Sequence, residues 1–334
     1  MSKVYDSDTK KVLLAKFTAS EQMKADNEGK ATSKLEDYWR IKTYVKPDDM
    51  LNPHYPIFSQ PYQLASHLLG GNWNLYNRCC VIQIAKCNLD CWYCYVDKQL
   101  RQGYTHRGDG TEIGHWFSPE EIHQMFKVSG TKVWRISGGE PTLAPEFLID
   151  MIKLLWLEDS LLWIDTNLVG DSRFYDLIKN VHPKFQENVG MCGCFKGFTE
   201  GDAAAATRVG GGILQVQFDQ ARRMVEDTHL NAFFYVPGIV VEGTNEKHIR
   251  QFFERMVEEV DPMAPLRTYI LEIKNYSSTE VGEWKRWKAE FPVQMDNGGY
   301  FQRPIDIWQS LLREYYTPEQ IWLPNHQIQF QKRG

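Results

Sequence analysis

Two hydrophobic periodicities alternate along the chain from residue 80 to about residue 276. Short apolar runs rich in β-branched and aromatic residues are typical of buried strands, and stretches with apolar residues every three or four positions are typical of helices. The runs predict strands over residues 80–85, 132–137, 161–166, 189–195, 231–236 and 268–274. The intervening stretches predict helices from residue 118 and over residues 145–157, 173–180, 215–227 and 246–260.

This order of elements predicts an α/β fold. Alternating strands and helices form a parallel sheet, because each strand returns to the same edge of the sheet through a helix. Six units are fewer than the eight of a closed barrel, so we predict a partial (β/α)6 TIM-like barrel that is open on one side.

The predicted barrel spans residues 80–276 and is flanked on both sides. Residues 1–79 form an N-terminal extension, which we expect to contact a substrate or partner. Residues 10–30 within it are polar and indicate a helix or a mobile segment. Residues 277–334 form a C-terminal tail rich in aromatic residues, with helical spacing over 305–315. We expect this tail to cover the open barrel.

One helix start is marked by its own residues. Ser118 suits an N-cap, Pro119 suits the first turn, and Glu121 is placed to complete a capping box. We therefore expect a helix to begin directly after Ser118.

Composition narrows the class of protein. The chain has 334 residues, a net charge of −5 and a pI near 6.0. This balance argues against a dedicated nucleic-acid binder, which usually carries a basic stripe. No apolar run reaches the roughly 18 residues that span a bilayer, and no secretory signal pattern opens the sequence. We expect a cytoplasmic protein that makes no membrane contact.

Three of the seven cysteines stand in one short run. Cys87, Cys91 and Cys94 are separated by three and then two residues. Structural zinc takes four ligands, often from two separated pairs, whereas three thiolates can hold a four-iron cluster with one iron open to another ligand. The run therefore favours an iron–sulfur cluster. The alternatives are ordinary buried cysteines or a non-catalytic iron–sulfur protein.

Polar and flexible residues follow the ends of the predicted strands. In a parallel barrel these ends lie together and form the active site. The residues in question are Ser137, Gly138, Gly139 and Glu140 after the second strand, Asp165 and Asn167 at the third, Lys196 after the fourth, and Pro237 and Gly238 after the fifth. Taken singly, each group also fits a turn, a helix cap or a solvated rim.

Two further features carry less weight. Cys192 and Cys194 alternate on one strand and share a face, which favours small buried side chains over a redox or hydrogen-donor role. The glycines at 210–212 lack the following lysine and serine or threonine of a phosphate-binding loop.

The cysteine spacing, with Tyr93 before the third cysteine and Gly138-Gly139-Glu140 after the second strand, resembles the radical S-adenosylmethionine (SAM) superfamily. The resemblance implies a [4Fe–4S] cluster on Cys87, Cys91 and Cys94, with SAM bound through its amino and carboxylate groups at the open iron. It also implies cleavage of SAM to methionine and a 5′-deoxyadenosyl radical.

The same resemblance implies roles for the remaining candidates. The Gly138–Glu140 run would grip the SAM ammonium, and Lys196 would pair with the SAM carboxylate. Asp165 and Asn167 would meet the ribose and the methionine end. Tyr93 and the Pro237-Gly238 pair would lie beside adenine.

Two tripeptides suggest a narrower group. Asp165-Thr166-Asn167 and Val236-Pro237-Gly238 resemble the equivalent strand ends of glycyl-radical-enzyme activases. This implies a protein or peptide substrate and an electron donor such as flavodoxin or ferredoxin. A second hypothesis is radical modification of a peptide natural product or of tRNA, although the acidic pI disfavours tRNA. Binding of SAM would separate both enzymes from a non-catalytic iron–sulfur protein.

Overall fold

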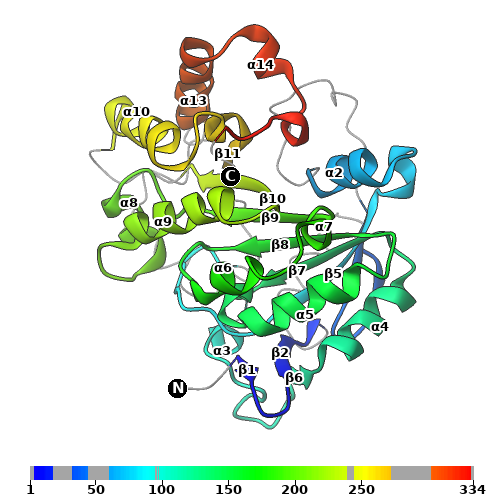
Figure 1. The fold of residues 1–334 in the computed structure, drawn as a ribbon. Coiled ribbons are helices and arrows are strands. Elements are labelled where there is room, and N and C mark those ends of the chain that lie inside the picture. The colour runs from blue at the N-terminus through cyan, green and yellow to red at the C-terminus, as the bar shows by residue number, and fades with distance from the viewer. Residues whose placement is uncertain are drawn as a thin grey trace.

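The structure is a computed structural model that describes residues 4–17, 32–43, 60–94, 96, 98–238, 244–271 and 302–331. Its centre is one mixed sheet of eleven strands, with helices against its outer face (Figure 1). No helix within the described residues is long and apolar enough to cross a membrane.

Six parallel strands form the main part of the sheet and lie side by side in chain order. They are β5 (Arg78–Ile84), β7 (Val133–Gly138), β8 (Leu161–Thr166), β9 (Val189–Cys194), β10 (Asn231–Pro237) and β11 (Thr268–Leu271). The α/β prediction is confirmed, and the strand order is the one expected of a partial (β/α)6 barrel. Residues 272–274 of the last predicted strand lie outside the described residues.

Helices connect these strands across the outer face. They include α4 (Pro119–Ser129), α5 (Pro145–Leu155), α6 (Arg173–Ile178), α9 (Ile213–Glu226) and α10 (Glu246–Arg255). Helix α4 begins as predicted: the Ser118 hydroxyl accepts from the Glu121 backbone N–H, and the Glu121 carboxylate accepts from the Ser118 N–H.

Further helical elements lie before β5 and between the strands. They are η3 (Trp73–Leu75), α3 (Lys98–Arg101), η4 (Pro141–Leu143), α7 (Pro183–Gln186), α8 (Glu200–Thr207), the π-helix η5 (Met256–Val260) and η6 (Ala264–Arg267). The π-helix continues α10 directly.

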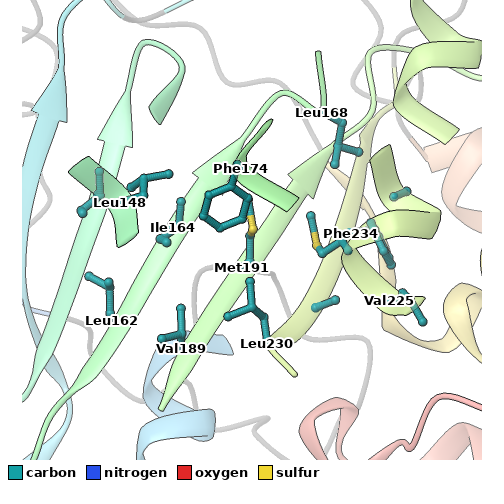
Figure 2. Close-up of a cluster of buried hydrophobic side chains, with 14 of the residues drawn as sticks. Leu148, Leu162, Ile164, Leu168, Phe174, Val189, Met191, Val225, Leu230 and Phe234 are labelled. Carbon is teal, nitrogen blue, oxygen red and sulfur yellow. The ribbon is translucent and has the colours of Figure 1, made fainter. Parts of the chain in front are cut away.

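The larger core lies between the sheet and the outer helices. Every second strand residue points into it, including Leu162 and Ile164 of β8 and Met191 of β9 (Figure 2). Leu148 of α5 and Phe174 of α6 meet them from the helix layer. All five side chains are fully buried, so the outer face of the sheet is held mainly by removal of apolar surface from water.

A second core fills the inner face of the sheet. Helix α2 (Gln60–Leu69) lies against this face and buries Tyr62 and Leu64 beside Cys79 and Trp163. Gly190 makes room for this contact, because a side chain there would collide with the Trp163 ring and Leu64. Helix α2 was not predicted from the sequence, yet it closes the barrel at the start of its strands.

The N-terminal extension contributes strands to the sheet. These are β1 (Tyr5–Asp6), β2 (Lys11–Ala15), β3 (Thr32–Leu35) and β4 (Arg40–Thr43), and β2 also pairs with β6 (Gly114–Phe117). Both β4 and β2 pair antiparallel with β5. The helical or mobile segment expected over residues 10–30 is therefore wrong over β2, because pairing with β5 and β6 decides its conformation.

The C-terminal segment packs against α10 and the residues before β11. It comprises α13 (Gln302–Tyr315), α14 (Pro318–Trp322) and η8 (Asn325–Gln327). The Trp308 ring lies 4.9 Å from that of Phe253 in α10, and Arg267, just before β11, donates to the Ile328 carbonyl at 2.6 Å. Residues 302–331 thus cover α10 and the starting end of β11. Residues 277–301 lie outside the described residues, so a tail over the open barrel stays a prediction.

Candidate functional site

The cysteine run forms a loop at the carboxyl end of β5. The Lys86 and Cys87 backbone N–H groups donate to the carbonyls of Leu100 and Arg101, at 2.7 and 2.9 Å. Further on, the Trp92 N–H donates to the Ala206 carbonyl of α8 at 3.2 Å. Backbone hydrogen bonds therefore hold the loop between α3 and α8. Because they use main-chain atoms, the cysteine side chains remain available to bind other groups.

The cysteine sulfurs accept hydrogen bonds from nearby amides. The Leu89 N–H donates to Cys87 Sγ at 3.5 Å, and the Val96 N–H donates to Cys94 Sγ at 3.4 Å. Burial, followed by the nearby Cys91 thiol, raises the pKa of Cys87 to about 12. Burial likewise raises the pKa of Cys94, although Arg101 opposes the shift. These thiols stay protonated at neutral pH until a cation displaces their protons.

The two glycines after β7 allow the cysteine loop to pass close by. Gly138 has φ of +99°, a left-handed conformation that favours glycine. A side chain at Gly139 would overlap the Lys86 carbonyl oxygen. Instead, the Gly139 N–H donates to the Ile84 carbonyl at 2.7 Å, and the Glu140 N–H donates to that of Lys86 at 2.9 Å. The glycines thus join the end of β7 to the start of the cysteine loop.

Glu140 is fully buried and lies beneath this junction. Its Oε1 accepts from the Thr142 N–H at 3.0 Å, the Thr142 hydroxyl at 2.6 Å and the Thr166 hydroxyl at 2.7 Å. Its Oε2 accepts from the Asn167 N–H at 2.6 Å. A carboxylate offers about four acceptor positions, and these four hydrogen bonds already match that capacity. Gly170 packs against this network, where a side chain would overlap Thr142.

Asn167 connects Glu140 to the cysteine loop. Its Nδ2 donates to Asn88 Oδ1 at 2.8 Å and to Cys87 Sγ at 3.5 Å. Its Oδ1 accepts from the Val169 N–H at 2.8 Å. The sequence placed Asn167 and the cysteines in one site, and the structure brings Asn167 and Cys87 into contact.

Gln217 of α9 is a site residue that sequence reasoning missed. Its fully buried amide donates to the Asn167 carbonyl at 2.6 Å and to the Cys194 carbonyl at 2.9 Å. Its Oε1 accepts from the Lys196 N–H at 3.0 Å. It therefore joins the ends of β8 and β9. A glutamine within the apolar stripe of a predicted helix was the available signal.

Lys196 and Tyr93 face each other across the site. Lys196 is buried, its Nζ lies 6.0 Å from the Tyr93 ring centroid, and it donates to Cys194 Sγ at 3.0 Å. Its pKa is raised well above the usual value, because the nearby Cys194 and Tyr93 side chains outweigh the effect of burial. Lys196 therefore keeps its positive charge close to the cysteine loop, where an anionic group would be stabilised.

Asp165 points into the barrel and is already paired. Its Oδ2 accepts from Arg135 Nε at 2.7 Å, and its Oδ1 accepts from Trp163 Nε1 at 2.9 Å. Asp165 lies directly opposite Cys192 in the register between β8 and β9. Both carboxylate oxygens of Asp165 therefore accept hydrogen bonds on the inner face of the sheet. Asp165 lies two residues before Asn167 in the chain.

The remaining predicted residues lie at the same edge of the sheet. Ser137 is buried at the end of β7, beside Gln83 in the register with β5. Pro237 ends β10 and Gly238 follows it, and the Gly238 N–H donates to the Leu271 carbonyl of β11 at 2.9 Å. The structure thus connects Glu140, Asn167, Cys87, Lys196 and Tyr93 through hydrogen bonds and close contacts, whereas Pro237 and Gly238 contact the next strand.

The residues present fit an iron–sulfur cluster by the chemistry of their donors. The loop supplies three cysteines, and amide N–H groups already point at two of the sulfurs, as they do around Fe–S ligands. Within the residues that the structure describes, no three His, Cys, Asp or Glu side chains are gathered around a common point as metal ligands. Cys87, Cys91 and Cys94 would hold the cluster, and Lys196 would offer charge to an anion beside it.

The comparisons with known proteins agree with the site. Residues 81–188, which hold the cysteine loop, the two glycines, Glu140 and Asn167, match the radical SAM superfamily. The proteins of this family use a [4Fe–4S] cluster and SAM. No curated protein sequence matches the chain.

Several solved structures resemble the fold at low identity. SuiB of Streptococcus suis bound to S-adenosylmethionine is 12% identical over 64% of this chain, with a TM-score of 0.40. QueE from Escherichia coli is 15% identical over 64% of this chain and 82% of its own, with a TM-score of 0.39. TYW1 with a lysine–pyruvate adduct is 11% identical over 77% of this chain and 85% of its own, with a TM-score of 0.40. The chain spans 47% of the length of SuiB, and likenesses this weak assign no substrate.

Proposed function

We propose that this chain, a radical SAM enzyme, abstracts a hydrogen atom from a protein or peptide substrate after cleaving SAM. The observation that carries the proposal is the contact of the cysteine loop with the ends of β7 and β8, through Gly139, Glu140 and Asn167. Cys87, Cys91 and Cys94 would hold a [4Fe–4S] cluster, which would supply the electron for cleavage of SAM to methionine and a 5′-deoxyadenosyl radical.

The chain's own residues bind and orient the cofactor. Lys196 carries a buried positive charge suited to the SAM carboxylate. The backbone carbonyls after β7 suit the ammonium, and Glu140 would exchange one of its four present donors to contact it. Tyr93 presents a partly buried ring whose buried hydroxyl has no hydrogen-bond partner among the described residues, which suits an adenine and its ribose. Asp165 is turned toward Arg135, so its contact with SAM would require exchange of that partner.

A macromolecular substrate is supported by the surroundings of the loop. Asn88 at the tip of the loop is exposed. The N-terminal strands lie directly beside the loop, since the Ala85 N–H donates to the Leu13 carbonyl of β2 at 2.9 Å. We propose that the N-terminal extension provides substrate or partner contacts at this edge, and that a flavodoxin or ferredoxin delivers the electron.

The narrower proposal is an activase that installs a glycyl radical on a partner enzyme. It is supported by the Asp165-Thr166-Asn167 and Val236-Pro237-Gly238 runs, which resemble the strand ends of that group. The test is anaerobic incubation of the reconstituted enzyme with SAM, dithionite and a glycyl-radical enzyme encoded beside it. An electron paramagnetic resonance doublet on the partner, together with one 5′-deoxyadenosine per radical, is the expected result.

A different outcome would redirect the proposal. If 5′-deoxyadenosine forms but the partner shows no radical, the reaction class stands and the activase assignment fails. Consumption of a short precursor peptide would then favour peptide modification, and consumption of tRNA would favour a tRNA enzyme. The net charge of −5 argues against tRNA. No SAM binding at all would favour a non-catalytic iron–sulfur protein.

A further inference from the structure

We propose that Asn167 is a positioning residue for the iron–sulfur cluster, whose amide holds the Cys87 sulfur and raises the reduction potential of the cluster. The inference rests on the proposed function, because it requires a cluster held by Cys87. It differs from a role in binding SAM, which is what the family resemblance implies for this residue.

The hydrogen-bonding capacity of the side chain is the first observation. A primary amide has two N–H donors, and those of Asn167 are directed to Asn88 Oδ1 and Cys87 Sγ, at 2.8 and 3.5 Å. Its oxygen already accepts from the Val169 N–H at 2.8 Å. Both protons are therefore used inside the protein, and one oxygen lone pair is all that remains for a cofactor.

The rigidity of the backbone around Asn167 is the second observation. Its N–H donates to Glu140 Oε2 and its carbonyl accepts from Gln217 Nε2, both at 2.6 Å. The next residue, Leu168, takes a left-handed conformation with φ of +59°, and its N–H donates to the Thr166 hydroxyl at 3.1 Å. Asn167 is 6% exposed. Hydrogen bonds to the N–H and the carbonyl of Asn167 thus fix its backbone, and the fixed backbone places the side-chain amide beside the Cys87 sulfur.

The electrostatic consequence follows from the charge of the cluster. Reduction adds one negative charge, and an N–H donor to a ligand sulfur stabilises the reduced form more than the oxidised form. The effect is strong here because the amide is buried, where hydrogen bonds are less screened by water. Loss of the amide should therefore make the midpoint potential more negative.

The experiment compares three variants with the wild-type chain after anaerobic reconstitution. Asn167→Ala removes the donor, and Asn167→Asp keeps the shape and the acceptor to Val169 while removing the donor. Gln220→Leu is the matched control, since the Gln220 amide donates to the Gly170 carbonyl at 3.1 Å and touches no thiol. The readouts are iron content, the midpoint potential from a redox titration, and resistance of the iron to a chelator.

We expect a more negative potential for Asn167→Ala, a still more negative one for Asn167→Asp because of its added charge, and the wild-type value for Gln220→Leu. We also expect half of the iron to be lost at a roughly tenfold lower chelator concentration in both Asn167 variants. If Asn167→Ala fails to fold, the near-isosteric Asn167→Asp decides the question.

Wild-type potential and iron retention in a folded Asn167 variant would overturn the inference. An equal shift in Gln220→Leu would also overturn it, because the effect would then be general to the fold. A wild-type chain that takes up no iron would instead refute the proposed function, so the two failures are distinguishable.

Discussion

The two ends of the parallel sheet are built on opposite principles. At the carboxyl end, the buried side chains of Glu140 and Gln217 bond to the backbone N–H and the backbone carbonyl of Asn167. At the starting end, Tyr62 and Trp163 fill the barrel with apolar surface. Buried polar groups are costly when unpaired and rigid when satisfied, whereas apolar packing tolerates adjustment. The carboxyl end therefore fixes the positions of the site residues, and the starting end contributes mainly to the stability of the fold.

The strongest test of this contrast compares cysteines from the two ends. Cys87→Ala, Cys91→Ala or Cys94→Ala should abolish the ~400 nm absorbance after reconstitution and reduce 5′-deoxyadenosine to background, because three ligands are needed. Cys79→Ala is the control, since this buried thiol lies at the start of β5. It should retain full iron. Loss of iron in Cys79→Ala alone would mean that the cluster lies elsewhere.

Substitution of Glu140 should lower both the stability of the protein and its affinity for SAM, with a smaller effect than loss of a cysteine. Glu140→Ala leaves several buried donors unpaired, each costing about 1–3 kcal/mol, so the free energy of unfolding should fall by roughly 3 kcal/mol. SAM binding should weaken while the cluster remains, measured by titration calorimetry on the reconstituted protein. Unchanged SAM affinity in a destabilised variant would show that Glu140 acts purely within the protein.

Arg267 provides the counterpart at the starting end. It is 3% exposed, lies between the Phe233 and Phe330 rings, and donates to the carbonyls of Ala232 and Ile328. Arg267→Met should lower the free energy of unfolding by about 2–3 kcal/mol in a denaturant titration, because buried carbonyls lose charged donors. Iron content and SAM affinity should not change. A loss of SAM affinity would show that the two ends are coupled.

The weakest expected effect is a loss of stability at low pH, caused by His326 at the starting end of the sheet. Burial, followed by the neighbouring His67 and Arg267, lowers the pKa of His326 from 6.5 to about 4. The unfolded chain therefore binds a proton near pH 6.5 that the folded chain does not bind until about pH 4. Stability is complete above pH 6.5 and falls by about 1–2 kcal/mol as the pH decreases to 4, after allowance for partial exposure.

His326→Asn should remove this contribution, because asparagine does not titrate. The measurement is the difference in unfolding free energy between variant and wild-type chain at pH 7 and pH 4.5, which cancels the other titrating groups. An identical pH dependence in the two proteins would contradict the assignment. Iron uptake should be alike in both proteins at neutral pH, since His326 lies beside α2 and not beside the cysteines.

Local signals in the sequence were sufficient for the alternating part of the fold. The strand predicted over residues 161–166 matches β8 at both ends, and the predicted N-cap at Ser118 is confirmed. Periodicity and capping report the conformation of a segment from its own residues. Helix α2 and strands β2 and β4 were not predicted, because their conformation depends on partners distant in the chain.

The site shows the same division. The cysteine spacing and the Gly138-Gly139-Glu140 run pointed to the superfamily that residues 81–188 match. The roles assigned to Asp165 and Lys196 stay predictions, since the structure shows Asp165 paired with Arg135 and Lys196 with Cys194. Gln217 was missed because its one signal, a glutamine within the apolar stripe of a predicted helix, does not identify the groups that it bonds to. Its importance comes from two carbonyls supplied by other strands.

Strand β5 bonds to antiparallel strands β2 and β4 on one edge and to parallel β7 on the other. This has a consequence for a chain that leaves the ribosome from its N-terminus. The early strands β2 and β4 emerge before any partner in the main sheet exists, and they must wait for β5. Once β5 is made, each later parallel strand can dock beside the one synthesised just before it. The strand that presents the cysteines is therefore also the point at which growth of the nascent sheet can begin in both directions.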